Sequence, residues 1–298
     1  MTSNTSILRL FKTLICGLVA GSSSLFAAIN LPPHSPVPGG IAVLDLPEQS
    51  ASENDNLSAS YRGARVMLVS PMETGTKHWQ AIVGIPLSAK PGHHQLTITS
   101  DQGKQSGVTF DVNKKTYKEQ RITLTNKRQV NPYAADLERI KREKRLMVAA
   151  FKDWNTSLTP TMTLTKPTIG PLSSPFGLRR FFNDQPRNPH SGLDFAAPEG
   201  TAIQAPAEAI VVATGDYFFN GNTVLLDHGH GLVTMYCHMS RIDVSKGDHV
   251  QLDDTIGLVG KTGRVTGAHL HWSVSLNNAR IDPNLLMPKE PKTDSSTP

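Results

Sequence analysis

Short segments that alternate apolar and polar residues fill the chain from about residue 41 to residue 125. Turn residues separate them at short intervals, and the segments are Ile41 to Leu46, Arg65 to Ser70, Trp79 to Leu87, His94 to Thr99, Gly107 to Val112 and Arg121 to Thr125. Evenly spaced short strands of this kind are typical of a small antiparallel sandwich. We therefore predict an N-terminal β-sandwich domain over residues 31–128.

The hydrophobic period changes from two to between three and four after Asn131. The positions that recur at this spacing are Leu137, Ile140, Lys144, Met147, Phe151 and Trp154. They form one apolar stripe that Lys144 interrupts. Asn131 is suited to cap a first turn, and Pro132 is tolerated at the first helical position. The pattern predicts a connecting amphipathic helix over 131–155, either packed on one domain or docking near an active groove as a movable element.

The remainder of the chain returns to a β pattern after a polar, Thr- and Pro-rich linker over 156–171. Its segments are Thr201 to Gln204, Ala209 to Thr214, Thr223 to Asp227, Val233 to His238, His249 to Leu252, Ile256 to Gly260 and His271 to Leu276. These predict a second, antiparallel β domain over 165–287, so the chain as a whole is mainly β. Residues 288–298 are expected to be a disordered tail. Around Pro91, the N-terminal domain resembles the edge of an immunoglobulin-like sandwich.

The first 28 residues are expected to be a secretory signal peptide. Arg9 and Lys12 begin an apolar run, and small residues follow as far as Ala27 and Ala28, near which we expect cleavage. The run is too short for a permanent anchor, and no other segment is long and apolar enough to span a bilayer. The mature protein is therefore expected in the periplasm or outside the cell, with no stable membrane span.

Composition adds little to this assignment. The formal net charge is +5, and it falls to +3 when Arg9 and Lys12 leave with the signal peptide. Such a surface suits an acidic polymer such as the cell wall, and charge alone does not distinguish this from nucleic acid. The chain has two cysteines, and removal of Cys16 leaves Cys237 alone, so no internal disulfide is expected. Cys237 is predicted to be a buried strand residue, with a thiol nucleophile as the alternative.

Two segments of the second domain carry the candidate chemistry. They are His190-Ser-Gly-Leu-Asp194 and His269-Leu-His271. In extended chain, residues two or four apart point to the same face, so each segment presents its polar pair together. A catalytic zinc site uses three nitrogen, sulfur or carboxylate ligands and keeps a fourth position for water. Two histidines and one aspartate fit that number, and His238 lies between the segments, where it is available to act on the water.

The neighbouring sequence identifies a family. Ser174-Pro-Phe-Gly-Leu-Arg179 precedes the first pair, Gly192-Leu-Asp-Phe-Ala-Ala-Pro198 surrounds Asp194, and Val259 to Trp272 carries the second pair. Over about residues 165 to 287, this set resembles the M23 family of lysostaphin-type zinc metallopeptidases, which cleave peptidoglycan.

The resemblance implies a zinc ion bound by His190, Asp194 and His271. It also implies that His238 and His269 are the catalytic pair beside it, in a β domain with an open groove. One of the pair would accept the proton of water and the other would donate to the oxyanion; we assign these roles to His269 and His238 in that order and leave the order open. A glutamate base of the H-E-x-x-H kind is absent from the sequence. His228 and His230, in a hairpin turn, are expected to be structural.

The expected function is hydrolysis of peptidoglycan cross-links. The leading substrate is the bridge from D-Ala to diaminopimelate, and the partners are peptidoglycan stem peptides rather than nucleic acid. Cleavage of glycyl bridges is the second possibility. Two other classes stay open: a non-catalytic activator of other wall hydrolases, and a protein whose N-terminal sandwich is the main functional unit as a binding module.

Overall fold

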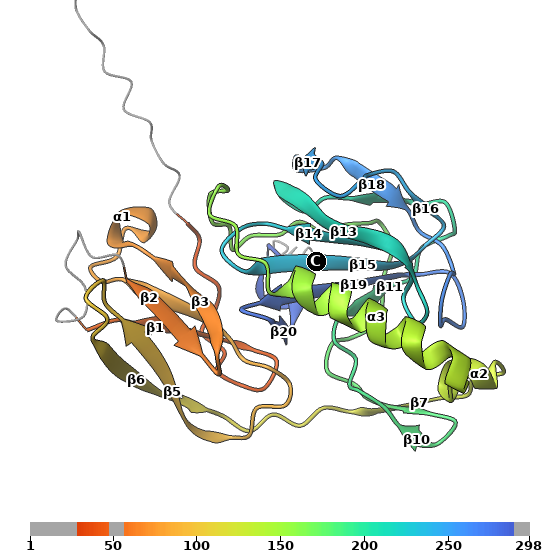
Figure 1. Ribbon diagram of the computed structural model, residues 1–298, viewed down its shortest axis with the longest axis horizontal. Helices are drawn as coiled ribbons and strands as arrows, with labels where there is room; N and C mark the ends of the chain where they lie inside the picture. The colour runs from red at the N-terminus through yellow and green to blue at the C-terminus, as the bar shows by residue number, and fades with distance from the viewer. Residues whose placement is uncertain (1–28, 48–56, 289–298) are drawn as a thin grey trace, which may run out of the picture.

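A computed structural model describes residues 29–47 and 57–288 of the 298-residue chain (Figure 1). The expected signal peptide over 1–28 and most of the expected tail over 288–298 lie outside these residues. Figure 1 shows two bodies: an orange and yellow β unit, and a larger β body from green to blue on which one long helix lies. The mainly β architecture with a connecting helix is confirmed.

The N-terminal unit is one antiparallel path of six strands. In spatial order the path is β1-β4-β3-β2-β5-β6, and a one-turn helix, α1 (Pro71–Thr74), follows β3. The strands are β1 (Ile41–Asp45), β2 (Ser58–Tyr61), β3 (Ala64–Val69), β4 (Gln80–Gly84), β5 (Gly92–Thr99) and β6 (Gln105–Val112). The first half of β3 pairs with β2 and its second half with β4, so β3 joins two sheet halves around one apolar core. The predicted small β unit is therefore present, although its continuous path differs from the two separate sheets of an immunoglobulin domain.

The next strand, β7 (Glu119–Ile122), does not belong to this unit. It pairs in parallel with β9 (Arg179–Phe182), which in turn pairs with β10 (Gln185–Pro186). The predicted sandwich over 31–128 is therefore too long, because its last segment completes a sheet of the second domain. Alternation of side chains predicts that a strand exists, but the backbone groups it pairs with are set by the tertiary fold.

The connecting helix, α3 (Ala134–Phe151), follows a single turn, α2 (Lys127–Val130). Its start differs from the prediction over 131–155, because Asn131 ends α2 and the carboxylate of Asp136 accepts the N–H of Tyr133 at 3.0 Å instead. The helix lies across one face of the large sheet (Figure 1), where Phe151 packs with apolar residues of the strands beneath.

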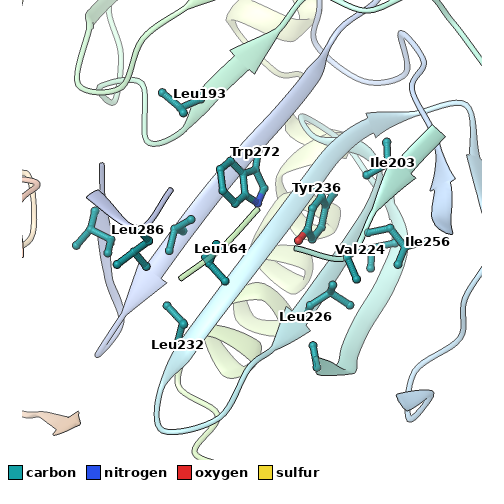
Figure 2. Close-up of a cluster of buried hydrophobic side chains, with 14 of the residues drawn as sticks. Leu164, Leu193, Ile203, Val224, Leu226, Leu232, Tyr236, Ile256, Trp272 and Leu286 are labelled. Atoms are coloured by element: carbon teal, nitrogen blue, oxygen red, sulfur yellow. The ribbon is translucent and has the colours of Figure 1, made fainter. Parts of the chain in front are cut away.

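The large sheet of the second domain has the order β17-β13-β14-β15-β19-β11-β8, with β20 beside β19. A smaller sheet has the order β12-β18-β16, and a short helix, η2 (Pro283–Leu285), closes the domain. The strands are β8 (Leu172–Ser174), β11 (Leu193–Phe195), β12 (Ala202–Gln204), β13 (Ala209–Tyr217), β14 (Gly221–Asp227), β15 (Leu232–Met239), β16 (Arg241–Ile242), β17 (His249–Val250), β18 (Thr255–Leu258), β19 (Leu270–Leu276) and β20 (Ala279–Ile281). Figure 2 shows Tyr236 and Trp272, paired across β15 and β19, among aliphatic side chains on the core face. The opposite face is the one that α3 covers in part.

The segment over 156–171 is a packed connection rather than a flexible linker. Met162 and Leu164 belong to the core of the second domain, and Leu164 appears among its side chains in Figure 2. The backbone N–H of Leu164 donates to the carbonyl of Leu286 at 2.9 Å. The Thr- and Pro-rich composition predicted an irregular backbone correctly, but it gave no sign that Leu158, Met162 and Leu164 are buried.

Asn277 joins the two bodies at the turn between β19 and β20. Its Oδ1 accepts the N–H of Gly84 at 2.6 Å, and its Nδ2 donates to the carbonyl of Gly84 at 3.0 Å. Asn277 is buried and has a left-handed φ of 43°, a conformation that Asn tolerates better than most residues. A single side chain thus satisfies both backbone groups of a glycine at the end of β4.

Replacing Asn277 with alanine should therefore weaken the contact between the two bodies. The change leaves the buried N–H and C=O of Gly84 without partners, which costs about 1–3 kcal/mol for each group that water does not reach. Chemical denaturation of the full chain should show a loss of that order. Asn278→Ala is the matched control in the same turn, and an equal loss in both variants would contradict the role of the Asn277 amide.

Asp227, at the end of β14, is a buried carboxylate with only part of its hydrogen bonding satisfied. Its Oδ1 accepts the N–H of Gly229 at 2.9 Å, whereas its Oδ2 is buried without a partner within the part of the chain that the structure describes. Burial raises the pKa of Asp227 to about 6, and the nearby Asp153 adds to this effect. Relative to the unfolded chain, the folded protein therefore favours the neutral form of Asp227.

This raised pKa makes stability depend on pH in a defined direction. The contribution of Asp227 is fully present below its unfolded pKa, about 4, and it is lost as pH rises through about 6. Asp227→Asn keeps an acceptor for Gly229 and cannot ionise. It should gain about 2–3 kcal/mol in unfolding free energy at pH 8 relative to wild type, and much less at pH 4. A gain that does not change between these pH values would contradict the ionisation of Asp227 as its cause.

Candidate metal centre and active site

Three of the residues singled out in the sequence meet on the sheet face beneath α3. Asp194 on β11 and His271 on β19 are cross-strand partners, so their side chains leave the same face, and His190 reaches them from the loop before β11. The Nε2 atom of His190 lies 2.9 Å from Asp194 Oδ1 and 3.0 Å from His271 Nδ1. His271 Nδ1 lies 2.7 Å from the same Asp194 oxygen. All three side chains are buried.

The outer contacts of these side chains fit a bound cation. The carbonyl of Pro175 can only accept, so at 2.7 Å it takes the Nδ1 proton of His190 and leaves Nε2 with a lone pair. That lone pair faces a carboxylate oxygen and a second imidazole nitrogen, an arrangement that a shared positive charge stabilises. His271 places its other nitrogen 2.9 Å from Ser273 Oγ. Such partners on the far side of a ligand are usual in metal sites.

Asp194 also forms a salt bridge outside the three-residue group. Arg180 on β9 donates from Nη2 to Asp194 Oδ2 at 2.9 Å. Burial opposes ionisation of Asp194, but the contacts of its carboxylate with the His190 and His271 rings outweigh burial and hold its pKa well below the usual range. Burial lowers the pKa of His271 to about 4. At neutral pH the group therefore offers an ionised carboxylate and a neutral His271 imidazole, which are the protonation states that bind metals.

Gly192 is required for this approach. A Cβ atom at Gly192 would lie 2.3 Å from the carbonyl oxygen of Trp272 and 2.9 Å from Cε1 of His271. Both distances are shorter than a carbon atom allows. The glycine in the motif between His190 and Asp194 therefore lets the loop come close enough to β19 for the three side chains to meet.

His238 and His269 stand beside the three-residue group without joining it. Their ring centroids are 4.9 Å apart, and the centroid of His238 is 6.1 Å from that of His271. Each ring gives its Nδ1 proton to a backbone carbonyl at 2.9 Å, that of Thr262 for His238 and that of Gly267 for His269. Because a carbonyl only accepts, the neutral form of each ring has its lone pair on Nε2. Each of the two rings can therefore accept a proton.

Alternation along a regular strand predicts that the side chain of Cys237 points away from His238, and the structure shows that this prediction is wrong. Cys237 is the cross-strand partner of His271 and so shares its face. His238 has a left-handed φ of 66°, which breaks the strand pattern and brings the next side chain to the same cavity. Burial raises the pKa of Cys237 to about 12. Its thiol is therefore protonated at neutral pH, which argues against a nucleophile.

Two cavities flank the three candidate ligands His190, Asp194 and His271, which are called the metal group below. The first has a volume of about 320 Å³, and its wall includes Gln120, Leu124, Ser174, Asp194, Thr266 and His269. The second has a volume of about 480 Å³, and its wall includes Lys144, Met147, Arg187, His190, Arg280 and His271. Four residues line both cavities: Arg180, Phe182, His238 and Arg264. An extended ligand that occupied both cavities would therefore pass over the metal group.

Residues before the second domain build part of these walls. Gln120 on β7 lines the first cavity, while Lys144 and Met147 on α3 line the second. Lys144 is the residue that interrupts the apolar stripe, and the interruption was the one signal in the sequence that this helix faces a polar space. The sequence gave no comparable signal for the arginines that line the cavities, because it does not show which segments their strands and loops contact in the fold.

The comparisons agree with this arrangement. The model of peptidase family M23 matches residues 188–283, and that of the M23 N-terminal domain matches residues 34–115. A solved structure from Pseudomonas aeruginosa, assigned to peptidase M23, is 43% identical in sequence to this chain and superposes with a TM-score of 0.69. The alignment covers 84% of this chain and 94% of that one. The chain belongs to peptidase family M23.

Two further relatives match over little more than a third of this chain. The peptidoglycan DD-endopeptidase ShyA of Vibrio cholerae is 43% identical over 112 residues, which are 37% of this chain and 26% of ShyA. The DD-carboxypeptidase/endopeptidase Mpg of Neisseria meningitidis is 38% identical over 112 residues, which are 38% of this chain and 26% of Mpg. The matched part thus spans about a quarter of each of these relatives. Membership of M23 implies a metal, and the group of His190, Asp194 and His271 is the candidate for it.

Two further features of this M23 chain bear on earlier expectations. His228 is buried, with Nδ1 at 2.9 Å from the carbonyl of Glu208 and Nε2 at 2.8 Å from Thr234 Oγ1, contacts that fit a structural role. Among residues 29–47 and 57–288, no helix combines the length and apolar character needed to cross a membrane.

Proposed function

We propose that this chain is a zinc endopeptidase that hydrolyses the peptide cross-links of bacterial peptidoglycan, with the bridge from D-Ala to diaminopimelate as its leading substrate. The observation that carries the proposal is the convergence of His190, Asp194 and His271 between two cavities, with two proton-accepting histidines beside them. The names of ShyA and Mpg support the substrate class.

In this proposal, His190 Nε2, an oxygen of Asp194 and His271 Nδ1 hold the zinc ion. The chemistry that zinc supplies in such a site is polarisation of the scissile carbonyl and a lower pKa for the attacking water. Arg180 holds the second oxygen of Asp194, and Pro175 and Ser273 hold the far nitrogens of the two histidines. These contacts fix the orientation of the three side chains before substrate arrives.

His238 and His269 then move the protons of the reaction. With Nδ1–H held by a carbonyl, each ring starts as an acceptor at Nε2. The ring that takes a proton from the attacking water becomes an Nε2–H donor, which is able to stabilise the developing oxyanion or to protonate the leaving amine. Burial, together with the nearby His271 and His269, lowers the pKa of His238 to about 3, so His238 begins neutral. We assign acceptance of the water proton to His269 and donation to the oxyanion to His238, which must first gain a proton at Nε2.

The place of action in this proposal is outside the cytoplasm. Peptidoglycan lies beyond the inner membrane, and the names of the relatives refer to that polymer. The basic and apolar N-terminal segment is the export signal in the proposal, with cleavage near Ala27 or Ala28. The mature chain would then act in the periplasm or after secretion.

Digestion of purified sacculi by the full, zinc-loaded chain tests this function. We expect cross-linked muropeptide dimers to decrease and their monomers to increase, as measured by mass spectrometry of the soluble products. Loss of glycyl bridges from a wall that contains them, without cleavage of D-Ala to diaminopimelate, would support the glycyl-bridge alternative. Absence of any cleaved bond would leave the non-catalytic activator, which is favoured only if the chain accelerates another wall hydrolase.

A further inference from the structure

Arg264 stands where the two cavities meet. Its backbone N–H donates to the carbonyl of Phe219 at 2.9 Å, and its guanidinium carbon lies 4.4 Å from the ring centroid of Phe219 and 4.6 Å from that of Phe182. Contact with two aromatic rings fixes the position of an arginine side chain through stacking and cation–π attraction. Arg264 is therefore a positioned cation in the groove rather than a mobile surface charge.

The hydrogen-bonding capacity of Arg264 is almost unused. A guanidinium has five N–H donors. Across residues 29–47 and 57–288, the side chain makes one long contact, from Nη1 to the carbonyl of Gln129 at 3.4 Å, and no ion pair. The neighbouring Arg180, by contrast, is paired with Asp194 at 2.9 Å. A partly buried guanidinium with unused donors favours a ligand that accepts from it.

The charge around Arg264 favours an anion. Burial lowers the pKa of Arg264 to about 10, and the positive charges of Arg180 and Arg187 contribute, so it remains charged at neutral pH. Among the residues that the structure describes, Arg187 donates only to neutral oxygens, those of Val130, Pro186, Asn131 and Gln185. The three guanidiniums thus share a single carboxylate, that of Asp194, and excess positive charge faces the groove. A bidentate carboxylate is the anion that fits a guanidinium best.

The substrate in the proposed function carries such a group beside the bond that breaks. In a bridge from D-Ala to diaminopimelate, the carbon that bears the scissile nitrogen also bears a free carboxylate. The terminal D-Ala of an uncross-linked D-Ala–D-Ala stem has the same arrangement. A glycyl bridge has an amide at this position instead.

We infer that Arg264 binds the carboxylate on the leaving-amine side of the scissile bond and thereby selects D,D-bonds. This inference rests on the proposed function. In the reaction, the oxygen of water joins the carbonyl carbon, the C–N bond breaks, and the nitrogen leaves as an amine that still carries its carboxylate. The same contact admits a terminal D-Ala–D-Ala bond, so the chain also releases free D-Ala as a carboxypeptidase.

Two matched substrates test the inference. One is a stem-peptide dimer with the free carboxylate next to the scissile bond, and the other has that carboxylate as an amide. We expect wild-type kcat/KM to be about 10- to 100-fold higher for the free acid, because a charged hydrogen-bonded pair has that effect. Arg264→Gln should lose this factor on the acid and stay near wild type on the amide. Arg264→Lys should keep part of this preference, because lysine retains the positive charge but cannot bind a carboxylate through two parallel N–H donors.

Arg241→Gln is the control, since it removes an arginine charge from an exposed strand of the same domain that lines neither cavity. It should leave the preference for the acid unchanged. Equal wild-type rates on acid and amide would overturn the inference. So would equal losses on both substrates in Arg264→Gln with normal zinc content and melting temperature, because that pattern indicates a structural role.

A binding measurement separates this inference from the proposed function. The reaction product, a stem tripeptide with a free amine and carboxylate on the same diaminopimelate carbon, and its amide are titrated calorimetrically into the zinc-loaded full chain. If wild type hydrolyses neither dimer, the proposed function fails. Tighter binding of the acid in wild type but not in Arg264→Gln still supports the carboxylate site, and equal binding of acid and amide overturns it.

Discussion

Replacing either His190 or Asp194 with alanine is expected to remove the bound metal and the activity together. Each change takes one of three ligand atoms that lie within 4.8 Å of one another, and two ligands do not hold zinc in a closed geometry. We expect zinc content after dialysis to fall from about one per chain to near zero. The rate on sacculi should fall by about 10³-fold or more, since several kcal/mol of transition-state stabilisation leave with the metal.

The matched control for this experiment is Ser273→Ala. Ser273 touches His271 on the side away from the metal group, at 2.9 Å from Nε2. Its loss should weaken metal affinity by about 10- to 100-fold and leave a site that saturating zinc restores. Retention of stoichiometric zinc by both His190→Ala and Asp194→Ala would show that the ligands have been assigned incorrectly.

Changes at His238 and His269 should give the second large effect, with the opposite result for the metal. Both variants are expected to keep about one zinc per chain and to lose about 10²- to 10⁴-fold in kcat, because these side chains move protons rather than hold the ion. His238→Asn is the sharper change at its position, since Asn tolerates the left-handed φ of 66° at low cost. His269→Ala serves at the other position.

His249→Ala provides the reference for this pair. His249 is a half-exposed histidine of the same domain, paired with Glu208 and outside both cavities, and its removal should leave the rate near wild type. If His269→Ala loses zinc while His271→Ala retains it, the roles within His-Leu-His are reversed. Zinc content and rate are both measured on the same preparations of the His238, His269 and His249 variants.

The convergence of the three candidate metal ligands could be predicted from the sequence because their spacing and surroundings are local. His190, Asp194 and His271 each sit in a short motif of glycine and apolar residues, and extended backbone fixes which side chains share a face. The same reasoning failed at Cys237. It assumed regular alternation, and the left-handed backbone at His238 removes that regularity without any glycine in the sequence to announce it.

The features that could not be predicted all depend on contacts between distant segments. The strand pattern before residue 125 indicates β7 but not its parallel partner, since pairing depends on which edge the folded domain leaves open. Burial of Leu164 in a Thr- and Pro-rich segment likewise depends on the cavity that the second domain offers. The unused hydrogen-bond donors of Arg264 also depend on which side chains the fold places around it.

The parallel pairing of β7 with β9 changes where this protein can be divided. The segment that begins at Glu119 supplies β7, α3 and parts of both cavity walls. The unit that contains the metal group therefore begins before Glu119. A chimera that exchanges the N-terminal body should therefore be joined in the stretch between Val112 and Glu119. A junction at residue 188, where the family match begins, would separate the peptidase from part of the walls of both cavities.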